Sequence, residues 1–470
     1  MAPRPHFLVL TFPLQGHIAP ALRLARRLLA AAPDALVTFS TAEAALGRMF
    51  PAKPAAAAAP GAAGGAAESD GRLEFLPFSD GTAAGCERGS DWGEFNAYVA
   101  SFHAAGSRSV GELVYALAAR GRPVTRVVYT LMLPWAAGVA RARGIPSALY
   151  WIQPAAVFAI YHHYFHGHAG VVDEHRGDPS FVVHLPGLAP QAVGDLPSFL
   201  TQSTDPADIF HSIFTTLREL FDVLDRESPK ATVLVNTCQE LEAGALAAVG
   251  AYDVLPIGPV LPSGDEAGIF KQDDRNYMEW LDAKPANSVV YVSFGSLATM
   301  AKEQLSELLL GLEQSGRPYL CVVRKDNKAV LAETAMDEVL RNGMVVEWCD
   351  QVKVLSHEAV GCFVTHCGWN SVLESMASGV PMVGVPRMSD QRMNAQLVER
   401  EWCVGVCAEV DDDGVMYAAE VRRRIEGVMG EGEVAATVRQ VAGKWKKVIG
   451  EAIGKGGSSY ANLMTFVENA

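Results

Sequence analysis

Polar side chains with complementary chemistry are concentrated between residues 348 and 391. Here an apolar, strand-like run over residues 361–365 leads into His366, Asn370 and Ser371 and then into a helical pattern. The first turn of a helix has unpaired backbone N–H groups and the positive end of the helix dipole, so it attracts phosphate. The segment therefore predicts a diphosphate site at the start of this helix.

The other polar positions of this segment suit the remaining parts of a sugar nucleotide. The flat indole of Trp348 could stack on a nucleobase such as uracil, and Gln351 could hydrogen-bond the nucleoside. The carboxylate of Glu374 could accept hydrogen bonds from both ribose hydroxyls. Asp390 and Gln391 offer acceptors and donors that suit the hydroxyls of a hexose.

Two residues of this segment have a plainer structural interpretation. Ser371 and Glu374 have the spacing of a capping box, in which both side chains bond the first turn of a helix. We favour ribose binding for Glu374 because the surrounding polar positions all suit the same ligand. The neighbouring Trp369 could be a core residue only.

A second candidate for chemistry is His17, which follows the first strand-like run and opens the first helical pattern. This position is the carboxyl edge of the expected sheet, where doubly wound folds bind ligands. The ordinary imidazole pKa is about 6.5. The positive end of a helix disfavours protonation, which leaves a neutral ring able to accept a proton. His17 is therefore the candidate general base, although a histidine here could merely bond the backbone.

Two other turns could contact phosphate or metal. Phe294-Gly295-Ser296 ends a strand-like run, and a glycine followed by a hydroxyl permits close approach to phosphate. The acidic run 411–413 could hold a divalent cation, but Gly414 and the helical pattern after it favour a turn and cap. We therefore expect no metal site.

The sequence has no Gly-x-Gly-x-x-Gly after a strand, so it lacks the fingerprint of a dinucleotide-dependent dehydrogenase.

The elements that position these residues alternate between strand and helix patterns, which predicts parallel doubly wound sheets. At 470 residues the chain is too long for one ordinary core. We expect an N-terminal domain over residues 1–248, a linker over 249–280, a C-terminal domain over 281–450 and a final helix over 451–470. Predicted strands of the first domain are His6–Phe12, Ala35–Ser40, Val127–Thr130, Ser147–Ile152 and Thr232–Asn236; those of the second run from Ser288–Phe294 to Gly405–Glu409.

Composition excludes several classes of partner. A formal net charge of −14 argues against nucleic acid or an anionic membrane surface. The eight cysteines are sparse and lack CxxC spacing, which favours free thiols in a reducing, cytoplasmic compartment.

The start of the chain lacks the apolar core of a signal peptide. The uncharged run 144–161 contains two prolines and a glutamine, so we expect no membrane insertion. We also expect a monomer.

Several motifs together resemble family 1 of the plant UDP-glycosyltransferases. Besides residues 348–391, they are PLQGHIAPAL at 13–22, VLVNTCQELEAGAL at 233–246, PIGPVLP at 256–262 and YMEWLDAKPANSVVYVSFGS at 277–296. The similarity is greatest to the subgroup that glucosylates anthocyanins at the 5-hydroxyl, crocetin or auxin-like acids. It implies an α/β fold of two facing Rossmann-like domains (GT-B type) with a cleft between them. The first would bind the acceptor, the second would bind the sugar nucleotide, and the final helix would return to the first.

The resemblance also implies the reaction and the site. The reaction would be an inverting, metal-independent transfer of glucose from UDP-glucose to a small hydrophobic acceptor, without a cofactor. The implied UDP-sugar residues are Ser296, Trp348, Cys349, Gln351, His366, Trp369, Asn370, Ser371, Glu374, Asp390 and Gln391. The implied acceptor residues are Gln15, Trp151, Gln153, Phe158 and His162.

One catalytic position departs from the family pattern. Most members have an aspartate that orients the histidine and stabilises the imidazolium, and here Thr130 occupies that place. Threonine could orient the ring of His17 but cannot neutralise its charge. An acceptor that is already ionised needs less help, and a carboxylic acid has a pKa of about 4. A carboxylate or an acidic phenol is therefore the favoured acceptor.

Two further points stay open. Relatives often have a tryptophan where this chain has Arg387-Met388-Ser389, so packing beside the sugar could differ. Without the aspartate, the chain could also be a non-catalytic protein that binds a sugar nucleotide or another small molecule.

Overall fold

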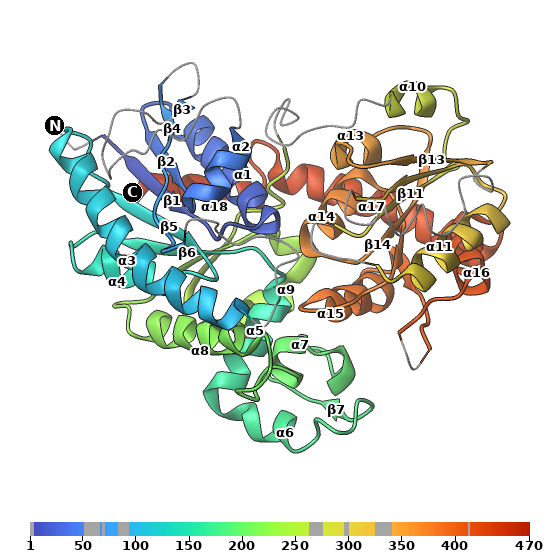
Figure 1. Cartoon of the computed structure of the whole chain (residues 1–470), viewed down its shortest axis with the longest axis horizontal. Coiled ribbons are helices and arrows are strands. Elements are labelled where there is room, and N and C mark those ends of the chain that lie inside the picture. Colours follow the sequence, from blue (N-terminus) through green and yellow to red (C-terminus); the bar gives the residue numbers. More distant parts are fainter. Residues whose placement is uncertain are drawn as a thin grey trace. The chain divides into compact units, whose positions relative to one another are not determined.

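A computed structural model describes residues 4–50, 66–67, 71–82, 94–262, 276–295, 300–324, 341–411 and 414–470. The chain forms two compact units (Figure 1). The first comprises Met1–Ser263 with Ala452–Ala470, and the second comprises Gly264–Glu451. Each unit has its own main sheet.

The sheet of the first unit has the strand order β10-β9-β6-β5-β1-β2-β4-β3. All neighbours pair in parallel except β3 and β4. The central strands are almost wholly buried apolar runs, as expected for a parallel sheet covered on both faces. The strands are β1 (His6–Leu10), β2 (Leu36–Ser40), β3 (Ala66–Ala67), β4 (Leu73–Phe75), β5 (Arg126–Thr130), β6 (Ser147–Trp151), β9 (Thr232–Val235) and β10 (Asp253–Pro256).

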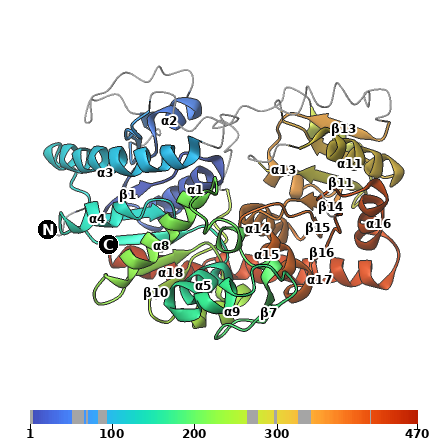
Figure 2. The same cartoon turned by 60° about the horizontal axis from the view of Figure 1, so that its bottom comes forward.

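Helices cover this sheet, with α1 against β1, β2 and β4, and α4 against β5 and β6. The helices α3 and α4 lie side by side in both views (Figures 1 and 2). Their bounds are α1 (Gln15–Ala31), α2 (Glu43–Met49), α3 (Phe95–Ala119), α4 (Trp135–Arg141), α5 (Ala155–His163), η2 (Tyr164–His168), α6 (Ala169–Asp173), η3 (Val193–Asp195), α7 (Ser198–Thr201), α8 (His211–Asp225) and α9 (Gln239–Ala248). A separate hairpin pairs β7 (Val182–Val183) with β8 (Gln191–Ala192).

The last helix, α18 (Ser458–Glu468), packs on this first unit, against α1 and β10 (Figure 2). The ring of Phe466 lies 6.0 Å from that of Phe7, and the guanidinium of Arg126 lies 5.0 Å from the Phe466 ring centroid. The hydroxyl of Ser459 donates to the carbonyl of Gly258 at 2.6 Å. These contacts tie the end of the chain to the sheet of the first unit.

The second unit is built on a parallel sheet with the order β13-β12-β11-β14-β15-β16. Its strands are β11 (Val289–Ser293), β12 (Tyr319–Val322), β13 (Gly343–Val346), β14 (Val360–Thr365), β15 (Met382–Gly384) and β16 (Gly405–Cys407). Its helices are α10 (Tyr277–Asp282), α11 (Lys302–Gln314), α13 (Gln351–Leu355), α14 (Trp369–Ser378), α15 (Gln391–Gln396), η6 (Leu397–Glu401), α16 (Ala418–Met429) and α17 (Glu433–Ile453). Two parallel-sheet, Rossmann-like units confirm the predicted fold class.

The segment 249–280, expected to be a linker, needs correction. Residues Asp253–Pro256 form the edge strand β10, which pairs with β9, and Tyr277–Asp282 form α10. The edge strand is partly exposed and ends at a proline, so it lacks the continuous apolar run that marks the central strands.

The candidate membrane segment 144–161 is divided between β6 and α5. Among the described helices, none has the combination of length and apolarity needed to cross a bilayer. Seven cysteines fall within the described residues, and all seven are free thiols.

Candidate active site

The start of α14 has the backbone geometry of an anion site. Strand β14 ends at Thr365, and Gly368 is the N-cap of α14, with φ −62° and ψ 140°. Only three residues separate strand from helix, and Cys367 among them has φ 60°. This tight turn places the first N–H groups of α14, and the positive end of its dipole, at the carboxyl edge of the sheet. The predicted position of the helix start is confirmed.

The capping-box interpretation of Ser371 and Glu374 is wrong. The helix begins at Trp369, so Ser371 is its third residue and cannot be the N-cap. Glu374 accepts a hydrogen bond from Gln351 Nε2 at 2.8 Å, and Ser371 Oγ accepts from the same nitrogen at 3.0 Å. Both side chains therefore turn toward α13.

Gln351, Ser371 and Glu374 thus form one hydrogen-bonded group, the donor cluster. Gln351 is the first residue of α13, and Asp350 caps that helix by accepting from the Lys353 N–H at 3.1 Å. Ser371 and Glu374 are almost completely buried, whereas Gln351 is partly exposed. Tertiary structure brings together three residues that the sequence marked separately for one nucleotide.

The ring of His366 lies between two glycines. A Cβ on Gly368 would be 2.4 Å from His366 Nε2, and one on Gly295, which has φ +71°, would be 2.7 Å from the same ring. Burial lowers the pKa of His366 to about 4, against the opposing effect of the Ser293 carbonyl, so the ring is neutral near pH 7. Gly295 was expected to permit the close approach of a phosphate. In the structure, the group that closely approaches Gly295 is the ring of His366. The adjacent Ser296 lies outside the described residues.

The aromatic residues of the segment divide into two kinds. Trp369 is 3% exposed and its ring packs 5.8 Å from that of Trp402, so its side chain is a core residue rather than a ligand contact. Any contact of Trp369 with a ligand would be made by its backbone, in the first turn of α14. Trp348 is partly exposed, so its predicted stacking on a base stays open.

Cys349 is buried, with its sulfur 3.4 Å from the Tyr291 hydroxyl, so its thiol faces the interior.

Asp390 and Gln391 lie at the start of α15, beyond β15. Asn394, which no sequence motif marked, donates to Asp390 Oδ2 at 2.8 Å and to the Cys367 carbonyl at 2.9 Å. It thereby joins the expected sugar contact to the turn before α14. The side-chain oxygen of Gln391 accepts from the N–H of Arg387 at 2.9 Å, which holds the loop before α15 in place. The spacing of Asp390 and Asn394 by four residues was the available signal.

In the first unit, His17 lies within the first turn of α1. Its ring centroid is 5.5 Å from that of Phe12, and its buried Nδ1 has no hydrogen-bond partner within the described ranges. Desolvation lowers the pKa of His17 to about 4. The ring is therefore neutral near pH 7, as a general base requires, and its Nδ1 does not bond the backbone.

Thr130 does not orient His17, and that prediction is wrong. Its hydroxyl donates to Thr11 Oγ1 at 3.5 Å and accepts from the Phe12 N–H at 3.4 Å. The reason is sheet order: β5 lies beside β1, so a short side chain at the end of β5 reaches the chain that leaves β1. Thr130 positions the segment before His17 rather than the ring itself.

Two of the expected acceptor residues belong to the core. Trp151 and Phe158 are both 0% exposed, and their rings pack 5.1 Å apart. The Trp151 indole donates to the Pro154 carbonyl at 2.9 Å, and Phe158 also packs on Phe221. Both predictions are wrong because the end of β6 and the start of α5 turn these rings toward neighbouring helices.

The other three expected acceptor residues, Gln15, Gln153 and His162, are partly exposed and stay predictions. The His162 ring lies 4.2 Å from that of His166, and no described residue forms a hydrogen bond with its buried Nδ1. Burial, with the neighbouring histidines, lowers the pKa of His162 to about 4. It is a neutral residue near pH 7.

The core assignment of Phe158 leads to a stability prediction. Truncation of a buried phenylalanine typically costs about 3–5 kcal/mol. We expect Phe158→Ala to reduce the free energy of unfolding of the first unit by that amount, measured by urea denaturation. Gln153→Ala, on a partly exposed neighbour, is the control and should change it by less than about 1 kcal/mol. Equal small effects of both variants would contradict the core assignment.

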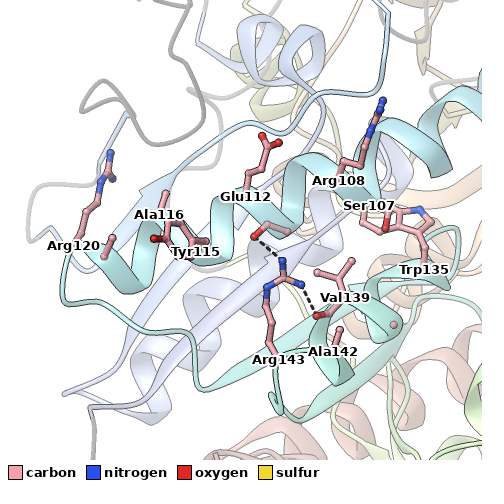
Figure 3. Close-up of a pocket in the computed structure, with 13 residues that line it drawn as sticks. Ser107, Arg108, Glu112, Tyr115, Ala116, Arg120, Trp135, Val139, Ala142 and Arg143 are labelled. Atoms are coloured by element: carbon pink, nitrogen blue, oxygen red, sulfur yellow. Dashed lines mark hydrogen bonds between the residues drawn. The ribbon is translucent and has the colours of Figure 1, made fainter.

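A groove of about 1240 Å³ lies elsewhere on the first unit, between α3 and α4 (Figure 3). Arg143 spans these helices by donating to the carbonyls of Gly111 and Val139, both at 3.0 Å. None of the residues predicted for the site lines this groove.

Metal binding has no support in the described residues, where no group of three or more His, Cys, Asp or Glu side chains is arranged to hold an ion. Asp411 accepts from the Val415 N–H at 2.8 Å and from the Tyr417 hydroxyl at 2.9 Å, as in a turn. Asp412 and Asp413 lie outside the described residues.

Comparison with known proteins places this arrangement in a family. Residues 252–431 match the family model described as UDP-glucoronosyl and UDP-glucosyl transferase. The chain is 42% identical to a chloroplastic crocetin glucosyltransferase from Gardenia jasminoides, over 100% of this chain and 98% of the relative. It is also 42% identical to UDP-glycosyltransferase 75C1 of Solanum lycopersicum, over 99% and 98% of the two chains.

Solved structures agree. Os79 from O. sativa in complex with UDP is 30% identical, with a TM-score of 0.80 and 99% of both chains covered. The coverage includes both units, so the whole chain has the GT-B fold of that protein. The chain therefore belongs to the plant UDP-glycosyltransferase family and is a UDP-glucose-dependent glycosyltransferase.

Proposed function

We propose that this enzyme transfers glucose from UDP-glucose, with inversion and without a metal or other cofactor, to a carboxylate or acidic phenol of a small hydrophobic plant metabolite. The proposed binding of the sugar donor rests on the donor cluster, which lies beside the start of α14. The assignment of the acceptor rests on a neutral His17 whose buried Nδ1 has no hydrogen-bond partner, acidic or otherwise, among the described residues.

On the donor side, each part of UDP-glucose has a place. Uracil stacks on Trp348, the ribose hydroxyls donate to Glu374, and the diphosphate lies at the first turn of α14 beside His366. Asp390 and Gln391 contact the hexose. Support comes from Os79, which was solved with UDP, and from the local geometry described above.

The reaction is a single displacement. An oxygen of the acceptor attacks the anomeric carbon from the face opposite UDP, the new C–O bond forms, and the bond to the diphosphate oxygen breaks. The N–H groups and dipole at the start of α14 stabilise the charge that builds on the departing diphosphate. His17 orients the acceptor and, for a neutral hydroxyl, takes its proton.

The chemistry at His17 favours acceptors that arrive ionised. Proton transfer from a hydroxyl would create an imidazolium whose buried Nδ1 is hydrogen-bonded to no carboxylate in the part of the chain that the structure describes. An anionic acceptor avoids this cost. Relatives named as crocetin, phloretin 4'-O- and anthocyanidin 3-O-glucoside 5-O-glucosyltransferases support small organic acceptors in general.

An acceptor panel tests this preference. The enzyme is incubated with UDP-glucose and matched aromatic acids, phenols and alcohols, and the products are identified by mass spectrometry. We expect acids and acidic phenols to be turned over at least tenfold faster than alcohols, with β-glucosides formed and no loss of rate in EDTA. Turnover of alcohols alone would contradict the acceptor class.

The same panel also bears on the non-catalytic alternative, against which the family membership of the chain argues. UDP binding without release of any glucosylated product from the panel would support a binding protein and contradict the proposed transfer. The expected monomeric state and cytoplasmic location stay predictions; the Gardenia relative is described as chloroplastic.

A further inference from the structure

Tyr291 is a buried residue whose hydroxyl contacts Gln351 of the donor cluster. It lies in the middle of β11, is 1% exposed, and stacks on Phe363 with ring centroids 4.8 Å apart. Its hydroxyl lies 3.2 Å from Gln351 Oε1 and 3.4 Å from Cys349 Sγ. No motif marked Tyr291 as a site residue, because a tyrosine in a buried strand has the sequence pattern of any core residue.

The directions of these hydrogen bonds follow from which groups can donate. Gln351 Nε2 donates to Glu374 and to Ser371, so Gln351 Oε1 faces Tyr291. A carboxamide oxygen can only accept, so the Tyr291 hydroxyl must donate to it. Burial raises the pKa of Tyr291 well above its ordinary value, which keeps that proton in place. The Cys349 thiol can donate to the Tyr291 oxygen in turn.

We propose that Tyr291 is a positioning residue for the nucleotide: its hydroxyl fixes the amide of Gln351, and Gln351 fixes the Glu374 carboxylate that binds ribose. Without that hydroxyl, Gln351 Oε1 loses its donor, and the amide can rotate away from Glu374. The carboxylate then loses its hydrogen bond from Gln351 and must be reoriented when the nucleotide binds. This inference rests on the proposed donor site.

The test is Tyr291→Phe, which keeps the ring and its stacking on Phe363 but removes the hydroxyl. We expect a five- to twentyfold rise in both the Kd of UDP, measured by calorimetry, and the KM of UDP-glucose. The kcat at saturating donor and the KM of the acceptor should change less than twofold, because the change acts on donor binding alone.

Tyr319→Phe is the matched control. Tyr319 is equally buried on the adjacent strand β12, but its hydroxyl donates to Glu313 at 2.8 Å, away from the donor cluster. We expect it to lower thermal stability without raising the Kd of UDP. If both variants weakened UDP binding equally, a general effect of losing a buried hydroxyl would explain the result and the proposal would be overturned.

A double-mutant cycle with Gln351→Leu separates positioning from packing. If Tyr291 acts through the Gln351 amide, Tyr291→Phe should have no further effect on the Kd of UDP in the Gln351→Leu background. Additive losses, or an unchanged Kd in the single variant, would refute the proposal. A wild-type protein that binds UDP but transfers no sugar would instead contradict the proposed function and leave this cycle interpretable.

Discussion

His17→Ala should lower the turnover of hydroxyl acceptors by roughly 10²–10⁴-fold, the usual contribution of a general base. The Kd of UDP should stay unchanged, because the predicted nucleotide residues all lie in the second unit. The measurements are initial rates with a phenol at saturating UDP-glucose and calorimetry with UDP. Full activity in the variant would remove His17 from the mechanism.

His17→Gln distinguishes a base from a hydrogen-bond donor. Glutamine can donate to a bound carboxylate but cannot take a proton from a hydroxyl. We expect this variant to keep at least a tenth of the wild-type rate with an aromatic acid and to lose the reaction with a phenol whose hydroxyl is protonated. Equal losses with both acceptors would contradict the preference for ionised acceptors.

The pH dependence has a defined sign. Burial lowers the pKa of His17 from about 6.5 to about 4, so the ring is neutral and competent as a base above that value. For hydroxyl acceptors, the wild-type rate attributable to His17 should stay level as pH falls through 6.5 and decline only near pH 4. A decline centred at 6.5 would indicate a solvated, ordinary imidazole.

Glu374→Ala should raise the Kd of UDP and the KM of UDP-glucose by about 10²-fold. The variant removes the proposed acceptor for the ribose hydroxyls and also one of the two partners of Gln351 Nε2, the one at 2.8 Å. An unsatisfied buried polar group costs about 1–3 kcal/mol, and each 1.4 kcal/mol is a factor of ten in affinity. Calorimetry with UDP measures the loss directly.

A matched control for this variant is Glu313→Ala in the same unit. Glu313 accepts hydrogen bonds from Tyr319 and from the Arg341 N–H, so it supports structure without contacting the donor cluster. We expect it to reduce stability and to leave the Kd of UDP within twofold. An affinity for UDP unaffected by Glu374→Ala would show that ribose binds elsewhere.

What the sequence determined was local. The apolar runs of β1 and β14 predicted buried parallel strands, and the turn that follows β14 predicted the start of α14 within one residue. The polar residues of 348–391 were marked because their types fit one ligand. The strand and helix predictions succeeded because strand burial and helix starts depend on residues that are close in the chain, whereas the ligand contacts of residues 348–391 stay predictions.

What only the tertiary structure decided was the direction of each side chain. Thr130 reaches Thr11, 119 residues away, because β5 lies beside β1. Phe158 packs on Phe221 inside the first unit, although its sequence position also suited an acceptor pocket. Tyr291 meets Gln351, 60 residues away, because the fold brings the middle of β11 within hydrogen-bond distance of the first residue of α13.

The physical reason is common to these cases. A strand or helix pattern specifies which positions are apolar, but the partner of a side chain depends on which distant element packs beside it. Hydrogen-bond directions in the donor cluster are likewise set by four groups from three separate segments, Tyr291, Gln351, Ser371 and Glu374. The sequence by itself indicated the family, predicted the two sheets and marked candidate residues for the donor; folding decided which of those residues lie in the core and which are held in the donor cluster.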